Sequence, residues 1–297
     1  MKPVTYVLSV PLETADAATA LKLRAAIDDM CAADPTLGMT IGPANEIILQ
    51  GQYELQLDIA VDILKRGKGL DCMVGAPQVA YRESITKKIE NEYTHRKHTG
   101  PAIPYAKVKI RFEPGAPGSG FVFKNAATSN EVPKEYVAGV EKGLLAAKET
   151  GVIAGFPLID LTCTLIGGHY DDIESNMMTF DIAARACFRE GIPKAGPKLL
   201  EPIMKVEVVT PEEYMGDVIG DLNLRRGQIQ GMDRSGNAQV IGAMVPLANM
   251  FGYMPSLSSL TRGRAQYTMV FDHYEQVPPA PRPGGDDDFP MAAALRW

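Results

Sequence analysis

The chain of 297 residues carries a formal net charge of −6, with 45% hydrophobic and 22% charged residues. This composition is ordinary for a water-soluble globular protein, and the length suits one large domain or two to three small ones. The acidic balance argues only weakly against nucleic-acid binding, although dedicated binders are usually basic. The sequence has no signal-peptide core and no apolar run long enough to span a membrane, so we expect a cytoplasmic protein.

The first 80 residues alternate between strand-like and helix-like patterns. Leu23, Ile27 and Met30 are spaced as one face of a helix. The predicted elements are a strand at 4–10, a helix at 16–33, strands at 38–42 and 46–50, a helix at 53–66 and a strand at 70–80. This β-α-β-β-α-β order predicts a ferredoxin-like sandwich.

The segment from 82 to 201 has a different pattern. Its predicted elements are strands at 105–113 and 120–124, a helix at 134–149, a strand at 158–166 and a helix at 174–190. Residues 95–98, which contain two histidines, an arginine and a lysine, are predicted to form a solvated basic loop. The segment is therefore predicted to be a mixed α/β domain.

The β-α-β-β-α-β order returns near the C-terminus. The run Thr210-Pro211-Glu212-Glu213 has the pattern of a capping box with proline at the first helical position, and it predicts a helix start. The predicted elements are a strand at 203–210, a helix ending at 226, strands at 227–232 and 238–245, a helix at 255–262 and a strand at 264–275. The residues that follow are rich in proline and glycine and predict a flexible tail.

Several stretches resemble bacterial elongation factor G, in the same order along the chain. Residues 74–83 (VGAPQVAYRE) resemble the junction of its third and fourth domains, and residues 200–208 (LEPIMKVEV) resemble the beginning of its fifth. Residues 216–227 (GDVIGDLNLRRG) resemble the first helix of that fifth domain. Residues 250–253 (MFGY) and 260–265 (LTRGRA) resemble its second half.

The resemblance implies an α+β fold class with three small domains. We expect a ferredoxin-like domain at 1–81, a ribosomal-protein-like α/β domain at 82–201, a second ferredoxin-like domain at 202–277 and a flexible tail at 278–297. For the fourth domain of the family, the resemblance also implies a left-handed β-α-β crossover. The general preference for right-handed connections would not predict it.

The GTPase half of the family is missing from this sequence. No GxxxxGK[ST] phosphate loop occurs, and Gly67-Lys68-Gly69 is predicted to end a helix. Without such a loop the chain is not expected to hydrolyse GTP, and no catalytic, cofactor or metal site is predicted in it. We expect a fragment whose parent, as the resemblance implies, binds GTP and magnesium in an N-terminal GTPase domain.

Two loops align with the tip of the family's fourth domain, which enters the decoding centre beside tRNA and mRNA. The candidate residues of these loops are Gly100, Pro101, His169, Tyr170 and Asp171. Asp171 stands where the family usually has histidine, and a carboxylate there removes a hydrogen-bond donor and adds repulsion toward phosphates. Two interpretations of His169 stay open, namely a substitute for that imidazole and an ordinary polar loop residue.

The arginines Arg225, Arg226, Arg262 and Arg264 lie at predicted helix ends of the fifth domain. Such positions favour capping and compensation of the helix dipole. The resemblance also implies phosphate contacts with the RNA of the large ribosomal subunit. The implied partners are therefore the ribosome, with its rRNA, tRNA and mRNA, and the absent GTPase domain. No membrane contact is expected, and the family suggests a monomer.

The function implied is that of a mechanical arm in tRNA/mRNA translocation or ribosome recycling. Gln56 stands where the family has the histidine of Gly-Glu-Leu-His, near the GTPase, so altered coupling is an expectation. Alternatives are a ribosome-protection factor of the tetracycline-resistance type, a small-molecule enzyme built on ferredoxin-like domains, and a protein-only adaptor. The enzyme alternative requires a closed pocket that holds perturbed acids or histidines.

Overall fold

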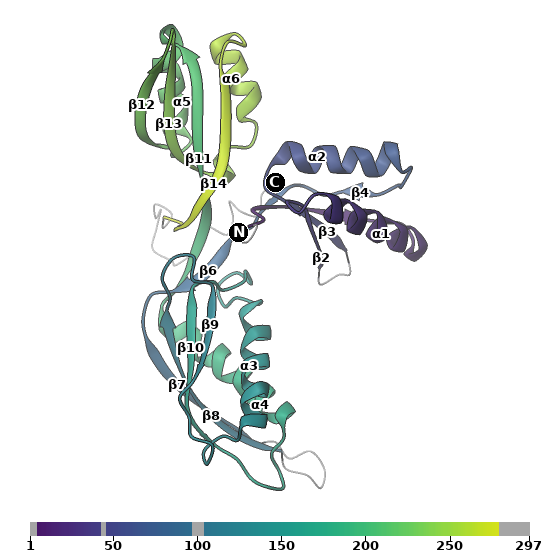
Figure 1. Ribbon diagram of the computed structural model, residues 1–297, viewed down its shortest axis with the longest axis vertical. Helices are drawn as coiled ribbons and strands as arrows, with labels where there is room; N and C mark the ends of the chain where they lie inside the picture. Colours follow the sequence, from purple (N-terminus) through teal and green to yellow (C-terminus); the bar gives the residue numbers. More distant parts are fainter. Residues whose placement is uncertain (1–4, 43–45, 97–103, 279–297) are drawn as a thin grey trace, which may run out of the picture. The chain divides into compact units, whose positions relative to one another are not determined.

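The computed structural model of the chain describes residues 5–42, 46–96 and 104–278 (Figure 1). Among the described residues the chain divides into two compact units, one formed by the residues up to 80 together with 201–275, the other by residues 81–200 and 276–278. These breaks lie next to the predicted boundaries after 81 and 201, and the exact three-domain division stays a prediction.

The N-terminal part of the first unit is a sheet covered by two helices. Its strands are β1 Leu8–Glu13, β2 Gly38–Ile41, β3 Ile47–Gly51, β4 Met73–Val74 and β5 Gln78–Val79. Its helices are α1 Ala17–Ala33, α2 Glu54–Asp62 and a π-helical turn Ile63–Gly67 that continues α2. The strand order is β2-β3-β1-β4, with β5 also paired to β1.

Buried residues alternate with more exposed ones along β1, and this alternation determines which face of the sheet packs against the helices. Leu8, Val10 and Leu12 are buried and belong to the same apolar cluster as Leu23 and Ile27 of α1. The residues between them point to the opposite face of the sheet, as the two-residue period of a strand requires. Asp16 caps α1 by accepting a hydrogen bond from the backbone N–H of Thr19 at 2.8 Å.

The second unit contains a four-stranded sheet and two helices. Its strands are β6 Arg82–Ile85, β7 Ile89–Arg96, β8 Tyr105–Pro114, β9 Phe121–Asn125 and β10 Leu161–His169. Its helices are α3 Lys134–Lys148, α4 Met177–Gly191 and a 3-10 turn Ile192–Ala195. The sheet order is β7-β8-β10-β9, and the neighbours β9 and β10 are parallel and joined through α3.

Helices α3 and α4 lie side by side against this sheet (Figure 1). Gly139 and Gly143 of α3, one turn apart, face the backbone of α4. A Cβ added at Gly139 would lie 2.4 Å from the carbonyl oxygen of Met177, and one at Gly143 would lie 2.5 Å from that of Asp181. The two helices therefore approach closely only because neither glycine has a side chain.

The loop between α3 and β10 is fastened by the buried carboxylate of Glu83 on β6. Its Oε2 accepts hydrogen bonds from the backbone N–H groups of Val152 at 2.7 Å and Ile153 at 3.1 Å. Its Oε1 accepts from those of Ala154 at 2.8 Å and Phe156 at 3.3 Å. One side chain thus satisfies four backbone donors of a loop that leads directly into β10.

The last part of the chain again combines one sheet with two helices. Its strands are β11 Pro197–Pro211, β12 Gln228–Ser235, β13 Ala238–Pro246 and β14 Gln266–Gln276. Its helices are α5 Met215–Leu224, α6 Tyr253–Thr261 and 3-10 turns Glu212–Tyr214 and Leu247–Asn249. The order is β12-β13-β11-β14, and the start of β11 pairs with β6. The α+β class predicted from the sequence is confirmed.

Three local predictions are wrong. The run after Thr210 forms no capping box, because Thr210 lies in β11 and its buried hydroxyl has no partner among the described residues. Residues 95 and 96 end strand β7 and are not part of a loop, while 97 and 98 lie outside the described residues. The first strand begins at Leu8, later than the predicted residue 4, because its pairing with β3 begins there.

All four cysteines lie in the described part of the chain and are free thiols. Cys72, Cys163 and Cys187 are buried, whereas Cys31 on α1 is half-buried. Burial raises the pKa of the Cys187 thiol to about 12, and it raises the pKa of Cys163 even further. These two thiols therefore stay protonated and act as small apolar groups of the core.

Candidate nucleic-acid interface

The loop 170–176, which connects β10 to α4, begins with two of the predicted tip residues and directly follows a third. His169 is the last residue of β10, and its ring meets the ring of Tyr105 edge-on at 5.6 Å between centroids. Tyr170 packs beside Tyr136 of α3, with 5.9 Å between ring centroids. His169 is exposed and Tyr170 is half-buried, so only the first is freely presented to a partner.

Asp171 serves its own loop. Its Oδ1 accepts hydrogen bonds from the backbone N–H groups of Ile173 at 2.9 Å and Glu174 at 3.0 Å. These bonds lower the pKa of the Asp171 carboxyl, since they favour its charged form. The carboxylate therefore has a structural role that its position in the sequence did not indicate. The predicted repulsion toward phosphates stays a prediction.

A second contact ties the loop to the neighbouring strand. The hydroxyl of Ser175 accepts a hydrogen bond from the backbone N–H of Asp171 at 2.9 Å and donates one to the carbonyl of Tyr105 at 2.6 Å. The backbone N–H of Tyr105 in turn donates to the carbonyl of Glu174 at 3.2 Å. The start of β8 and the loop are thus held together, so the loop is a fixed surface.

Ile173 is an exposed residue of this loop that sequence reasoning missed. Its side chain is 94% exposed at the crest of the loop, between the acidic residues Asp172 and Glu174. An isolated aliphatic residue inside a polar loop was the signal that could have identified it. The other predicted tip residues, Gly100 and Pro101, lie outside the described residues.

Replacement of Asp171 by alanine is expected to loosen the loop without unfolding the domain. The amides of Ile173 and Glu174 lose their acceptor, so their hydrogen exchange should accelerate roughly fivefold, the usual weight of a lost side-chain cap. Exchange measured by NMR tests this. Asp172→Ala is the matched control, because it removes a neighbouring carboxylate of the same loop and should leave both amides unchanged.

The hydrogen bonds accepted by Asp171 also make the stability of the loop depend on pH in the acid range. Because the folded pKa of Asp171 lies below its ordinary value of 3.8, the contact is fully present above that value and is lost as the pH falls through the folded pKa. Exchange of the two amides in the native chain should therefore rise below about pH 4 and should be pH-independent, apart from intrinsic chemistry, in Asp171→Ala. A native profile identical to that of the variant would contradict the assignment.

Two of the four candidate arginines are occupied inside their own domain. Arg225, only 18% exposed, pairs with Asp221 at 2.9 Å, donates to the carbonyl of Asn249 at 2.7 Å and lies over the ring of Tyr253 at 5.0 Å. Arg226 forms a two-pronged ion pair with the buried carboxylate of Glu201, at 2.6 Å and 3.3 Å. Both guanidinium groups therefore hold the domain together.

The other two arginines are more available. Arg262 ends α6 in the left-handed conformation, with φ of 52°, and its exposed side chain has no partner among the residues that the structure describes. Arg264 is 51% exposed and pairs with Glu213 at 2.6 Å, while its guanidinium lies over the Tyr214 ring at 4.7 Å. A charge held in place at the surface can still contact a phosphate, so these two residues form the better candidate site.

Gln56 at the start of α2 closes a small polar network. Its Oε1 accepts from the backbone N–H of Gln52 at 3.1 Å, and its Nε2 donates to Asp34 at 3.1 Å and to Thr36 at 2.6 Å. Hydrogen bonds from Thr36 lower the pKa of Asp34. The amide both donates and accepts here at any pH, because it does not titrate.

No helix able to cross a membrane and no metal cluster are found in the described ranges. None of their helices combines the length and apolar character needed to cross a bilayer. Within the same ranges, no three histidine, cysteine, aspartate or glutamate side chains gather closely enough to hold a metal ion.

Comparisons with known proteins agree with the resemblance seen in the sequence. The family model for elongation factor G domain III matches residues 4–76, the model for its domain IV matches 77–196, and the model for its C-terminus matches 198–283. A crystal structure of a protein from Thermus thermophilus is similar to the chain, with a TM-score of 0.72 and 35% identity. The match covers 91% of this chain and 41% of that one, so the chain spans about two fifths of its relative.

The ordered succession of these domains identifies the chain as part of a translation elongation factor. The chain belongs to the elongation factor G family and corresponds to the C-terminal half of that factor. The matched domains do not include the family's catalytic GTPase domain.

Proposed function

We propose that this chain is the ribosome-binding portion of an elongation factor G-like translocase, acting in tRNA/mRNA translocation or in ribosome recycling. The observation that carries the proposal is the match of three consecutive elongation factor G domains in their order along the chain. The longer parent protein would supply the GTPase domain with its GTP and magnesium. The chain itself would work in the cytoplasm as a monomeric, non-catalytic arm.

Two surfaces are proposed to touch RNA. The loop 170–176 of the second unit would approach tRNA and mRNA through its crest at Ile173 and through His169, both of which are exposed. Arg262 and Arg264 would contact phosphates of the large-subunit RNA. Their cationic side chains suit such contacts, which position a protein without reading sequence.

Removal of the two available arginines is expected to weaken ribosome binding. Co-sedimentation of the chain with bacterial ribosomes at two salt concentrations should show binding that falls with salt. The variant Arg262→Ala/Arg264→Ala should bind roughly tenfold more weakly, and its salt slope should be smaller by about two. Arg225 and Arg226 are left intact, because their loss would disturb the fold.

Lys22→Ala/Arg24→Ala is the matched control, since it removes two exposed charges from α1 in another part of the chain. It should bind like the native chain if the effect depends on place and not on net charge. Equal loss in both variants would refute the assignment to Arg262 and Arg264. Absence of binding at low salt would contradict the proposal that this chain binds ribosomes without its GTPase half.

A further inference from the structure

Arg264 has a fixed place in the turn that follows α6. Its backbone N–H donates a hydrogen bond to the carbonyl of Thr261 at 3.0 Å, and the backbone N–H of Ala265 donates to the hydroxyl of Thr261 at 3.2 Å. Thr261 is fully buried, and its hydroxyl donates in turn to the carbonyl of Leu257 at 2.7 Å. The backbone from which the Arg264 side chain starts is therefore fastened to the buried end of α6.

The guanidinium of Arg264 is held by two successive residues of another segment. Glu213 and Tyr214 end the 3-10 turn that precedes α5. The guanidinium lies over the Tyr214 ring at 4.7 Å, donates a hydrogen bond to the Tyr214 hydroxyl and pairs with the Glu213 carboxylate at 2.6 Å. Arginine stacks well on aromatic rings because its guanidinium is planar and weakly hydrated. The side chain is thus oriented although it is 51% exposed.

The held guanidinium keeps donors for a further ligand. The hydrogen bond to Tyr214 and the ion pair with Glu213 both use Nη2. Nε and Nη1 make no hydrogen bond with any residue that the structure describes, so the N–H donors on these two nitrogens stay available. A phosphate group offers anionic acceptors in a geometry that arginine matches. Arg264 can therefore bind a phosphate while Tyr214 still stacks on it.

Glu213 acts on the same guanidinium in the opposite sense. Its side chain is 57% exposed, and an ion pair between two exposed groups is weak in water. A phosphate that reaches Arg264 can therefore displace the carboxylate. Until it does, the carboxylate neutralises the cation and repels an approaching anion.

We propose that Tyr214 positions Arg264 for an RNA phosphate and that Glu213 competes with this phosphate for the guanidinium. The inference rests on the proposed function, in which Arg264 contacts ribosomal RNA, and adds how that contact is controlled. Tyr214 raises the affinity because the arginine side chain loses little freedom on binding, and fixing one such side chain in advance is worth roughly three- to tenfold. Glu213 lowers the affinity and so disfavours weakly bound anions.

The positioning role can be tested on the chain without ribosomes. The heteronuclear NOE of the Arg264 Nε–H, measured by NMR, should be that of an ordered group, whereas Arg262 serves as the mobile reference in the same spectrum. Tyr214→Leu keeps apolar bulk but removes the ring, so the NOE of Arg264 should fall to that of Arg262. Tyr214→Phe keeps the ring and should keep the NOE high. A mobile Arg264 in the native chain, or an ordered one in Tyr214→Leu, would overturn the inference.

Co-sedimentation with bacterial ribosomes measures the effect on binding. Tyr214→Leu should bind roughly fivefold more weakly at an unchanged salt slope, because the number of neutralised phosphates stays the same. Tyr214→Phe should restore most of the affinity. Glu213→Gln should bind about threefold more tightly, since one repulsive charge is removed. Glu212→Gln is the matched control, because it removes an exposed carboxylate of the same turn that does not pair with Arg264, and it should bind like the native chain.

The outcomes separate this inference from the proposed function. Native affinity in Tyr214→Leu, or equal tightening in Glu212→Gln and Glu213→Gln, would overturn the inference. If Arg264→Ala still weakened binding and lowered the salt slope by about one, the proposed function would stand without it. A native chain that does not bind ribosomes at low salt would contradict the proposed function and the inference together.

Discussion

Replacing Glu83 by alanine should destabilise the second unit by about 4 kcal/mol, near the upper end for a single substitution. The carboxylate is fully buried and accepts four backbone hydrogen bonds from the loop 152–156. Its loss leaves these half-buried donors without an acceptor, and an unsatisfied donor costs about 1–3 kcal/mol when it is fully buried and less when water can reach it. Because part of the loop can open to water, the total loss of stability stays below the sum of the four separate penalties.

The variant Glu83→Gln removes the negative charge but keeps the size of the side chain, so it shows how much of the effect depends on charge. Glu83→Gln keeps one acceptor oxygen but turns an NH2 group toward two backbone donors, so we expect roughly half the loss of stability, about 2 kcal/mol. The space around the side chain is already full, since a Cβ added at Gly151 would lie 2.2 Å from the Glu83 carboxylate. The site therefore cannot repack easily around a different group.

Hydrogen exchange of peptides from residues 81–200 measures this stability without interference from the other unit. Glu92→Ala is the matched control, because Glu92 pairs with Lys107 at 2.8 Å on the open face of the sheet, where both side chains are partly exposed. Such a pair contributes little to stability, because water and salt screen it. Equal exchange in Glu83→Ala and Glu92→Ala would contradict the role assigned to Glu83.

The second large effect is expected from a single added methyl group. Gly139→Ala should destabilise the same unit by roughly 2 kcal/mol, because the new Cβ would lie 2.4 Å from the carbonyl of Met177 and 2.9 Å from its side chain. The helix must move as a whole to relieve a contact with backbone. Since Met177 is the first residue of α4, directly after the loop 170–176, the tip should shift as well.

Gly220→Ala on α5 is the control for helix propensity. Nothing lies within 4 Å of a Cβ at Gly220, so alanine should stabilise that helix by about 0.5–1 kcal/mol. Hydrogen exchange of the amides in α3 and α4 measures the effect of Gly139→Ala, and exchange of those in α5 measures the effect of Gly220→Ala. The same change, glycine to alanine, is therefore expected to lower the free energy of unfolding at Gly139 and to raise it at Gly220. A stabilising Gly139→Ala would show that α3 and α4 are less closely packed than described.

The sequence predicted most of the helices and strands because their apolar periodicity is strong. The helix at 16–33 and the strands at 105–113 and 120–124 differ from α1, β8 and β9 by one residue or less at each end. Strand β7 was missed, since its outward residues Glu90 and Glu92 are stabilised by cations on β8 that only the folded register brings opposite. Pairing between distant strands carries no local signal.

The candidate site was predictable only in outline. Spacing and resemblance indicated which loops and helix ends to inspect, but not which side chains would be free. Arg225 and Arg264 are both arginines next to a predicted helix end, yet one is covered by Tyr253 and Asn249 and the other is at the surface. Asp171 likewise became a loop-fixing residue through amides two and three residues further on. These roles depend on three-dimensional neighbours.

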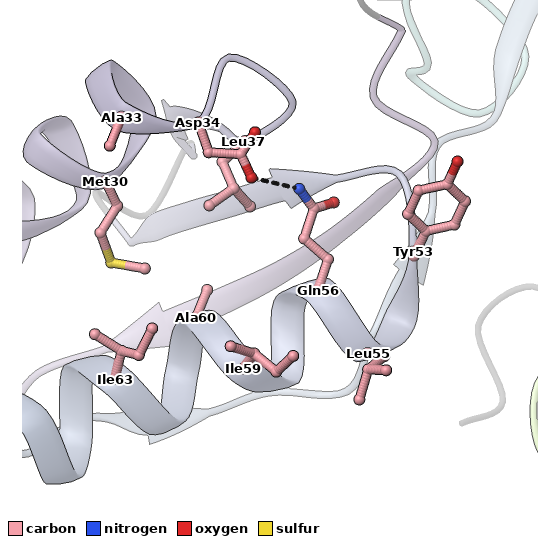
Figure 2. Close-up of a pocket in the computed structure, with 10 residues that line it drawn as sticks. All are labelled: Met30, Ala33, Asp34, Leu37, Tyr53, Leu55, Gln56, Ile59, Ala60 and Ile63. Carbon is pink, nitrogen blue, oxygen red and sulfur yellow. Dashed lines mark hydrogen bonds between the residues drawn. The ribbon is translucent and has the colours of Figure 1, made fainter.

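The unequal burial of the four cysteines gives the chain a built-in labelling site. Maleimide reagents attack the thiolate, which the buried Cys72, Cys163 and Cys187 do not expose. Cys31 is half-buried with a pKa raised by burial, so it reacts slowly and best at mildly alkaline pH. A dye attached there would occupy α1 next to Met30, at the wall of the apolar groove that α1 and α2 form (Figure 2), with no engineered cysteine required.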